Sequence, residues 1–211
     1  MPQRKTIQGF LDDVASAAPT PGGGSVAALA GALGTALTAM VGRLTIGKKK
    51  YADVEGEMRE VLAQAETLRA KLTSLIEKDA LAFEKVMEAF ALPKDGADRT
   101  ALRAAAIREA TKEATLVPLE VMKYCIDAHA LAQKVAAAGN MNAVSDAGVS
   151  AIMLHAACQG ASLNVRINLA GLDDHDFVGW KTDELQSLLN TSRSMAEETQ
   201  EIVDGRIEGK A

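Results

Sequence analysis

One carboxylate interrupts a long apolar pattern, and its type and place suggest chemistry. Between Val54 and Phe90, ten positions alternate in steps of three and four, the spacing of a buried helical seam. These positions are Met58, Val61, Ala65, Leu68, Leu72, Leu75, Asp79, Ala82, Val86 and Ala89. A charge on such a seam is costly unless it is paired or used. Asp79 is therefore either a structural carboxylate that a neighbouring helix satisfies, or a general base.

A glycine-rich turn is the second candidate for chemistry. Residues 19–25 read P-T-P-G-G-G-S, and a helix to about Leu44 is expected to follow, with Ser25 as its N-cap. Free N–H groups at a helix start attract anions, and glycine lets a ligand approach the backbone. The candidate binding residues are Gly22, Gly23, Gly24 and Ser25; the alternative is a plain turn. If the turn is functional, valine at Gly23 should harm activity more than stability.

The turn matches neither of two common nucleotide motifs. No Lys-Ser/Thr pair follows it, as a phosphate loop requires, and no strand precedes it, as a dinucleotide fingerprint requires. The helix behind it has one apolar face, made of Val26, Leu29, Ala30, Leu33, Leu37, Met40, Val41 and Leu44. Gly31 and Gly34 also lie in this helix, where glycine costs about 1 kcal/mol relative to alanine. Their presence suggests that another backbone, or a ligand, comes very close.

Two further stretches carry polar side chains with two possible roles each. The turn after the second helix holds Lys49, Lys50 and Tyr51, which are either a solvated helix end or an anchor for an anionic group. Asn164 and Asn168 are four residues apart and share one helix face. They are either two exposed amides or a polar strip over a substrate.

A loop at residues 140–146 contains side chains that prefer caps and turns over helix interiors. They are Asn140, Asn142, Ser145 and Asp146. Ser145 or Asp146 is expected to cap the helix that follows.

Composition narrows the class of protein. Of 211 residues, 48% are apolar but only 3% are aromatic, so alanine and leucine must fill a core of closely packed helices. The net charge of -5 argues against a nucleic-acid partner.

Cys125 and Cys158 are expected to be buried free thiols in a reducing cytosol. No signal peptide is expected. The charge-free stretch 14–42 is broken by prolines and glycines, and its apolar remainder is shorter than the roughly 20 residues of a membrane span.

The remaining patterns predict helices from end to end. Thr6 caps a first helix that Pro19 ends, and a helix from about Asp98 meets Pro118, which either kinks it or opens the next helix. Helices are also expected over residues 146–169 and 182–204, with Gly139 at a C-cap. The acidic loop 171–176 is not expected to bind metal, because adjacent residues cannot converge on one ion. The prediction is an all-α helix bundle, a single domain of long antiparallel helices over residues 1–211.

The sequence resembles the cyclodeaminase domain of formiminotransferase-cyclodeaminase and the stand-alone methenyltetrahydrofolate cyclohydrolases. The resemblance lies in the run PTPGGGSVAALAGALGTAL, and in Lys50-Tyr51, Lys78-Asp79-Ala80, Ala82-Phe83, Leu92-Pro93, Gly139-Asn140, Ser145-Asp146-Ala147, Asn164-Val165 and Asn168-Leu169. It spans nearly the whole chain in order. It implies that Asp79 is catalytic, that Asn140 and Asp146 are candidate pterin contacts, and that the lysine turn anchors a glutamate tail.

The resemblance implies a folate enzyme of one-carbon metabolism. The leading expectation is hydrolysis of methenyltetrahydrofolate to formyltetrahydrofolate, with Asp79 as general base and no metal or cofactor. The alternatives are formiminotetrahydrofolate cyclodeaminase and a non-catalytic helical adaptor. A cytoplasmic homodimer without nucleic-acid or membrane partners is expected, and small-residue faces at Ala28 to Ala36 and around Gly160 are the proposed contacts.

Overall fold

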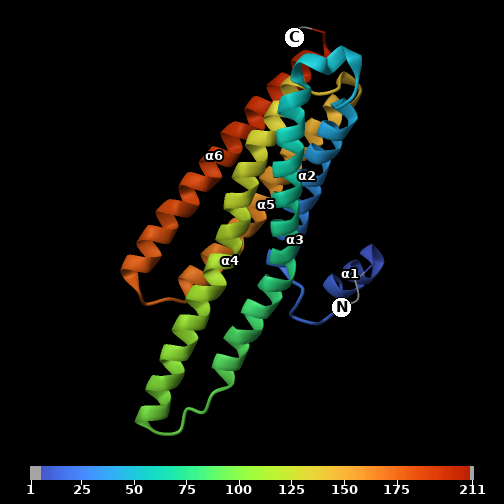
Figure 1. The fold of residues 1–211 in the computed structure, drawn as a ribbon. Helices are drawn as coiled ribbons and strands as arrows, with labels where there is room; N and C mark the ends of the chain where they lie inside the picture. Colours follow the sequence, from blue (N-terminus) through green and yellow to red (C-terminus); the bar gives the residue numbers. More distant parts are fainter. Residues whose placement is uncertain (1–5, 210–211) are drawn as a thin grey trace.

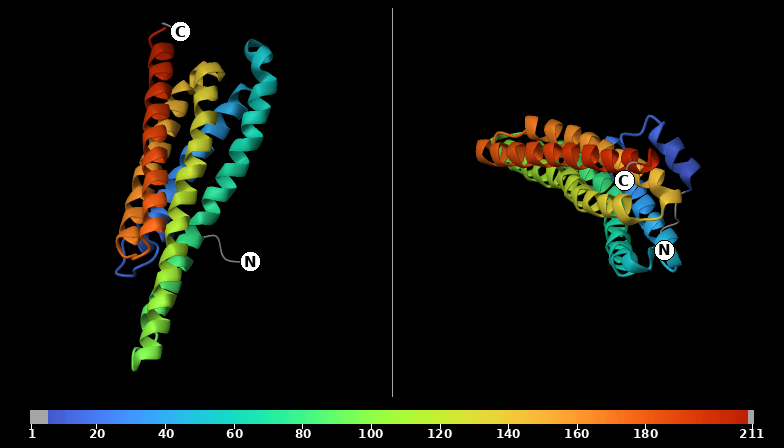
Figure 2. Two further views of the ribbon diagram at one scale, coloured as in Figure 1. Left: turned by 90° about the vertical axis from the view of Figure 1, so that its left-hand side faces the viewer. Right: turned by 90° about the horizontal axis from the view of Figure 1, so that it is seen from above.

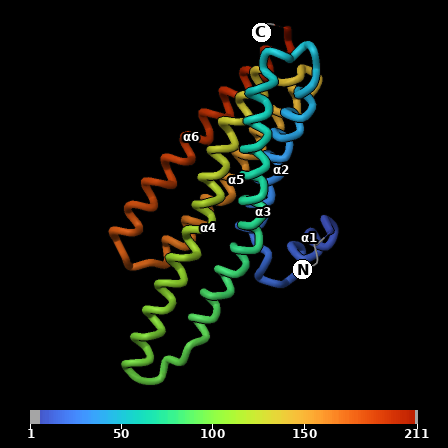
Figure 3. The backbone as a smooth tube through the Cα atoms, in the orientation of Figure 1, coloured from blue at the N-terminus to red at the C-terminus, as the bar shows by residue number. Residues whose placement is uncertain are grey.

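Five long helices lie side by side in an elongated bundle, and a short helix stands to one side (Figures 1 and 3). The computed structural model describes residues 6–209. The α-helices are α1 (Ile7–Val14), α2 (Gly23–Thr45), α3 (Glu55–Ala91), α4 (Ala97–Ala138), α5 (Val144–Ala170) and α6 (His175–Ile207), joined by the short 3₁₀ helices η1 (Lys49–Val54) and η2 (Met141–Ala143). Residues 6–209 contain no strand, which confirms the all-α prediction.

The seam of α3 is buried as its spacing predicts. The helix ends within one residue of the predicted bounds, and seven of the ten seam residues are buried. Asp79, Ala82 and Val86 are half-buried. They lie toward the end of α3 that projects with α4 beyond the other helices, so fewer neighbours cover them (Figure 2). Asp79 is thus the first of three partly covered seam positions, and Ala89 near the end of α3 is again buried.

Helix α2 buries mainly its small residues, whereas three of the eight residues of its predicted apolar face are exposed. Its buried side consists of glycine, alanine, serine and threonine with Val41, and it packs against α3, α4 and α5. A Cβ atom on Gly31 would lie 2.8 Å from Cys125 Sγ, so these helices approach as closely as the glycine implied. Val26, Leu33 and Leu44 are 40%, 50% and 43% exposed. Small residues face inward because three neighbours must approach one helix, which leaves the large ones outside.

Helix α4 passes through Pro118 without ending, which decides between the two predicted alternatives. Proline has no N–H, so the carbonyl four residues earlier, that of Ala114, loses its helical donor. The side-chain amide of Asn168 on α5 donates to this carbonyl at 3.1 Å. A neighbouring helix thus replaces the missing backbone hydrogen bond.

Several predicted helix ends agree with the structure and others do not. Helix α1 ends at Val14, five residues before Pro19, which was expected to end it. Thr6 Oγ1 accepts a hydrogen bond from Gly9 N–H at 3.0 Å, and Gly139 is a C-cap, as expected. The prediction that Ser145 or Asp146 caps α5 is wrong, because η2 leads directly into the helix and Ala143 occupies the N-cap. Helix α6 begins at His175, earlier than predicted, because Asp174 caps it by accepting from Phe177 N–H.

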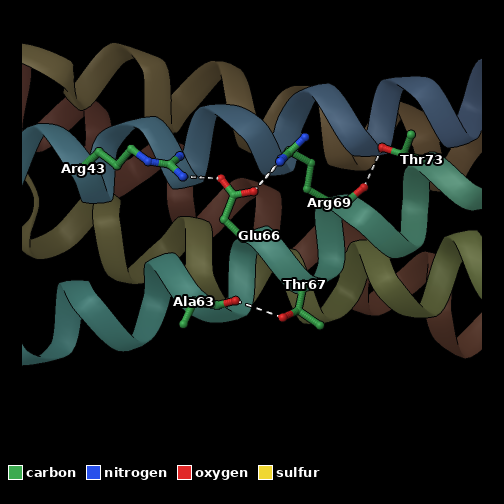
Figure 4. Close-up of polar contacts among 6 residues, drawn as sticks. All are labelled: Arg43, Ala63, Glu66, Thr67, Arg69 and Thr73. Carbon is green, nitrogen blue, oxygen red and sulfur yellow. Dashed lines mark hydrogen bonds and ion pairs between the residues drawn. The ribbon is translucent and has the colours of Figure 1, made fainter. Parts of the chain in front are cut away.

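An ion-pair chain ties α2 to α3 along one edge (Figure 4). Glu66 on α3 pairs with Arg43 on α2 at 2.7 Å and with Arg69 on its own helix. These hydrogen bonds, that of Arg69 first, lower the pKa of the Glu66 carboxyl. The pair fixes the neighbouring positions of α2 and α3 on the side away from the core.

By length and hydropathy alone, α2 could cross a membrane, contrary to the length argument from sequence. Its 23 residues pass that test, but 61% of the apolar window is buried inside the bundle. The core helix of a soluble protein meets the same criteria, so this observation is weak evidence for a membrane span.

A buried polar cluster joins α4, α5 and α6. Ser192 Oγ lies 3.2 Å from His129 Nε2 and 2.9 Å from His155 Nδ1. Ser192 thus links the two histidines, a contact that their positions in the sequence do not reveal. Burial, and then the positive charge of a protonated His155, lower the pKa of His129 to about 4. Cys125 and Cys158 are free and buried, as predicted, and their thiols contact each other beside this cluster.

The buried imidazole of His129 predicts a loss of stability in mild acid. The unfolded chain binds a proton near the ordinary pKa of 6.5, but the folded chain does so only near 4. The stabilisation is therefore complete above 6.5 and disappears as the pH falls toward 4, by up to about 3 kcal/mol. Urea unfolding at several pH values measures this slope. His129→Gln should flatten it, and an equally steep slope in that variant would contradict the assignment.

Candidate functional site

Asp79 on α3 faces the N-terminus of α2. Ser25 Oγ lies 2.9 Å from Asp79 Oδ2 and 2.9 Å from the carbonyl oxygen of Ile76, and its hydroxyl donates toward them. The prediction that Ser25 is the N-cap of α2 is wrong, because Gly22 occupies that position and the serine lies inside the first turn. The serine side chain therefore points across to α3, where it contacts the one carboxylate of the seam.

Two opposing effects set the proton affinity of this carboxylate. Partial burial raises the pKa of Asp79 above its ordinary value of 3.8, and hydrogen bonds from the hydroxyl and backbone N–H of Ser25 oppose that rise. The N-terminus of a helix also carries partial positive charge, which favours the ionised form. The result is a carboxylate that stays available as a base and holds a proton more readily than a free aspartate. The same contacts also let it act as a structural cap for α2 from a neighbouring helix.

Gly24 is the glycine that this arrangement requires. A Cβ atom there would lie 2.1 Å from Asp79 Oδ1, far inside van der Waals contact. At Gly23 the nearest atom to an added Cβ is Asn164 Nδ2 at 3.5 Å, an ordinary contact. The steric requirement therefore falls one residue after the position singled out from the sequence. Spacing could not distinguish these glycines, because only the approach of α3 decides which of them is crowded.

The two predicted amides of α5 have different roles. Asn164 lies beside Gly23, and its Nδ2 donates to the carbonyl of Gly160 in its own helix at 3.0 Å. Asn168 uses its amide to complete α4 at Ala114. Asn164 therefore belongs to the neighbourhood of Asp79, whereas Asn168 has a structural partner. The sequence signal for the structural role of Asn168 was Pro118, because a proline inside α4 leaves one backbone carbonyl without its helical donor.

The other predicted residues gather at the opposite end of the bundle. Asn140 donates through Nδ2 to the carbonyl of Leu44 at 3.0 Å, and its backbone N–H donates to Thr45 Oγ1. The hydroxyl of Tyr51 accepts from Met141 N–H at 2.9 Å. Both side chains thus join η2 to the end of α2 and to η1. Lys49, Lys50, Asn142 and Ser145 are exposed at this end, and Asp146 is half-buried.

Within one chain, the predicted site residues therefore fall into two groups, one at each end of the bundle. The end near Asp79 holds Gly22, Gly23, Gly24, Ser25, Asp79 and Asn164; the basic end holds Lys49, Lys50, Tyr51, Asn140, Asn142, Ser145 and Asp146. The length of α2 separates them, and 23 residues at 1.5 Å each span about 35 Å. Two surface grooves, of about 530 and 350 Å³ between α3 and α4, include none of these residues in their linings.

Comparisons of sequence and fold with known proteins find similar chains among enzymes that act on folates. The formiminotransferase-cyclodeaminase family profile matches residues 6–187. The methenyltetrahydrofolate cyclohydrolase of Methylorubrum extorquens is 46% identical over 98% of this chain and 100% of its own length. The formimidoyltransferase-cyclodeaminase of Mus musculus is 35% identical over 90% of the chain, which spans only 35% of that longer protein. The crystal structure of formiminotetrahydrofolate cyclodeaminase from Thermotoga maritima superposes with a TM-score of 0.88, at 34% identity, covering 97% of this chain and 98% of that one.

The crowding at Gly24 predicts a position-specific loss of stability. Gly24→Ala should displace the Asp79 carboxylate and break its bond with Ser25, at a cost of about 1–3 kcal/mol in the free energy of unfolding. Gly23→Ala is the matched control and should change that free energy by less than about 1 kcal/mol. Urea unfolding of both variants tests the difference. Equal effects at the two positions would mean that Asp79 does not make this close contact.

Proposed function

The chain belongs to the formiminotransferase-cyclodeaminase family, and we propose that within it this protein is a methenyltetrahydrofolate cyclohydrolase. The observation that carries the proposal is the carboxylate of Asp79, half-buried and with a raised pKa, against the glycine-rich start of α2. The full-length similarity to a relative with that name supports the choice of reaction.

The proposed reaction adds water to the carbon between two folate nitrogens. That carbon is electron-poor in the methenyl cation, so it needs no metal or organic cofactor to accept a nucleophile. Asp79 removes a proton from the attacking water, and its negative charge offsets the cationic substrate. The tetrahedral intermediate then opens: its hydroxyl proton is lost to solvent, one carbon–nitrogen bond breaks, and the released nitrogen takes the proton that Asp79 had accepted. A formyl group is left on the other nitrogen and the carboxylate is restored. Asn164 is the amide positioned at this end to orient the ring.

The second predicted amide does not fit this role within one chain. Asn140 lies at the basic end and uses its side chain on Leu44, so it is not part of the proposed chemistry at Asp79. The expectation that Asn140 contacts the pterin stays a prediction, and within one chain Asn140 and Asn164 do not share a site. The mechanism therefore depends on Asp79, Ser25, Gly24 and Asn164.

Formiminotetrahydrofolate cyclodeaminase is the second candidate, favoured by the likeness to the Thermotoga maritima enzyme of that name. In that reaction a folate nitrogen attacks the formimino carbon and ammonia leaves. A spectrophotometric assay with methenyltetrahydrofolate and formiminotetrahydrofolate side by side decides between the two. Calorimetry showing no folate binding would instead favour a non-catalytic helical adaptor. We further propose that the enzyme acts in the cytoplasm as a homodimer.

Replacement of Asp79 by asparagine separates the catalytic from the structural role. Asp79→Asn keeps the size of the side chain but cannot accept a proton, so turnover should fall by roughly 10²–10⁴-fold. Glu77→Gln, an exposed carboxylate two residues earlier, is the matched control and should keep its turnover. Turnover per folded molecule is the measurement. Near-normal turnover in Asp79→Asn would remove Asp79 from the mechanism.

The same variant has a predicted pH dependence of stability. Because folding raises the pKa of Asp79 above 3.8, the folded protein holds this proton at pH values where the unfolded chain has lost it. The contribution of Asp79 to stability therefore falls as pH rises through that window, and the cost of the ionised group is complete above the folded pKa. The melting temperature of Asp79→Asn should equal or exceed that of the wild type at pH 7, and the difference should shrink toward pH 4. A large loss of stability at pH 7 would instead identify a structural cap.

A further inference from the structure

Beyond Asp79, the projecting part of α3 carries three large apolar side chains on one side, which we call the α3 row. They are Phe83, Met87 and Phe90, which are 37%, 50% and 49% exposed. They follow Asp79 by 4, 8 and 11 residues, so at 3.6 residues per turn they lie within about a quarter of a turn of its side. An exposed apolar row that begins at the proposed base is suited to an apolar part of the ligand.

The α3 row is exposed because α2 begins level with Asp79. The two helices run antiparallel, since a Cβ atom added at Gly31 would contact Leu72 and one added at Gly24 would contact Asp79. Helix α2 begins at Gly23, so it does not extend beside α3 from Phe83 outward (Figure 1). A ligand on the α3 row would continue the line of α2, with one end at Asp79.

The far end of the α3 row is next to the guanidinium group of Arg103 on α4. Its Cζ lies 5.6 Å from the centroid of the Phe90 ring, and its Nε and Nη2 donate to the Phe90 carbonyl at 3.2 and 2.9 Å. These contacts hold the half-buried side chain in place. Within residues 6–209 no group accepts a hydrogen bond from Nη1, so its donors are available to a ligand.

Arg103 also differs from its neighbours in charge pairing. Between residues 78 and 112, five of the seven cationic side chains form ion pairs with carboxylates, namely Lys78, Lys85, Arg99, Arg108 and Lys112. The other two are Arg103 and the exposed Lys94, which pair with no carboxylate of residues 6–209. An oriented guanidinium with spare donors and no acidic partner is suited to bind a carboxylate of a ligand.

The proposed substrate contains complementary groups in the same order. In a folate, one of the two nitrogens that flank the reacting carbon is attached to a benzene ring, and an amide joins that ring to glutamate. Phe83 lies one turn, about 6 Å, beyond Asp79, which is the place of the benzene ring when the reacting carbon is at the carboxylate. Phe90, with Arg103 beside it, lies about 16.5 Å beyond Asp79, toward the glutamate of an extended folate.

We propose that the α3 row and Arg103 form the subsite for the aminobenzoyl-glutamate part of the folate. The benzene ring packs on Phe83, and a glutamate carboxylate accepts hydrogen bonds from Nη1 of Arg103. This inference rests on the proposed function and adds substrate-binding residues to it. Both contacts lie away from the reacting bond, so they contribute to binding and to the placement of the carbon at Asp79. The glutamate is then at the opposite end of α2 from the lysine turn that the resemblance implied.

The first test measures binding and does not depend on turnover. Tetrahydrofolate carries the glutamate, whereas tetrahydropteroate lacks it. In calorimetry without oxygen, Arg103→Gln should weaken binding of tetrahydrofolate by roughly 10- to 100-fold, the value of a hydrogen bond between charged groups, and leave binding of tetrahydropteroate unchanged. Glutamine can still donate to the Phe90 carbonyl. Arg99→Gln, on the same projection but paired with Asp95, is the matched control and should bind both probes like the wild type.

The second test concerns the benzene ring, which both probes contain. Phe83→Ala should weaken binding of both by roughly tenfold. Leu81→Ala removes a side chain that is 49% exposed on the opposite side of α3, and it should change neither affinity. Phe83→Leu keeps an apolar side chain and should also weaken both, and it decides the test if circular dichroism shows that Phe83→Ala is unfolded. Wild-type affinity in Phe83→Leu would remove the ring contact from the proposal.

The outcomes separate this inference from the proposed function. If the wild type turns over neither methenyltetrahydrofolate nor formiminotetrahydrofolate but the binding pattern holds, the proposed function fails and the subsite remains. If the wild type is active, Arg103→Gln should raise KM and leave kcat nearly unchanged, and an unchanged KM overturns the subsite. Equal affinity of the wild type for the two probes, binding of neither probe, or equal losses for both in Arg103→Gln also overturn it, because Arg103 would then not contact the glutamate.

Discussion

The contact between Asp79 and the start of α2 is the constraint on which the site depends. A carboxylate on a buried seam needs donors, and here they come from Ser25 in the first turn of a second helix. The approach is possible only because Gly24 has no side chain. The first turn of α2, Gly24 and Asp79 therefore depend on one another. The hydrogen bonds from Ser25 reduce the cost of burying the Asp79 carboxylate and also hold it in place. This explains how the group that we propose as the base can also be part of the link between α2 and α3.

Close packing around α2 has a second consequence for the molecule. Three neighbouring helices contact its inner side, and only residues such as Gly31, Gly34 and Ala28 leave enough room for them. The larger aliphatic residues of the same helix are therefore turned outward, beside those of α5. The small residues on the inner side of α2 and the exposed aliphatic residues on its outer side thus have one cause, the close approach of three neighbouring helices. The chain buries the small residues that permit close approach and leaves several larger apolar side chains exposed.

Buried polar groups in the bundle are satisfied by partners from distant parts of the sequence. Asn168 supplies the donor that Pro118 removes from α4, and Ser192 lies between His129 and His155. Each case links two or three helices through one side chain. Such contacts specify the alignment of the helices along their axes, which apolar contacts alone leave loosely defined. The alignment matters for the site, because Asp79 must lie level with the first turn of α2.

The sequence by itself determined the helical class, the extent of α3 and the unusual place of Asp79, because the period of apolar residues reports which side of a helix is buried. The resemblance added the family, which the comparisons confirm. Tertiary structure alone decided that Gly24 rather than Gly23 is crowded, that Ser25 contacts α3 instead of capping α2, and that the lysine turn and Asn140 lie far from Asp79. Periodicity also located the apolar face of α2 but not its direction. An apolar row has the same spacing whether it meets its own chain or another molecule, and only the positions of the neighbouring helices distinguish the two.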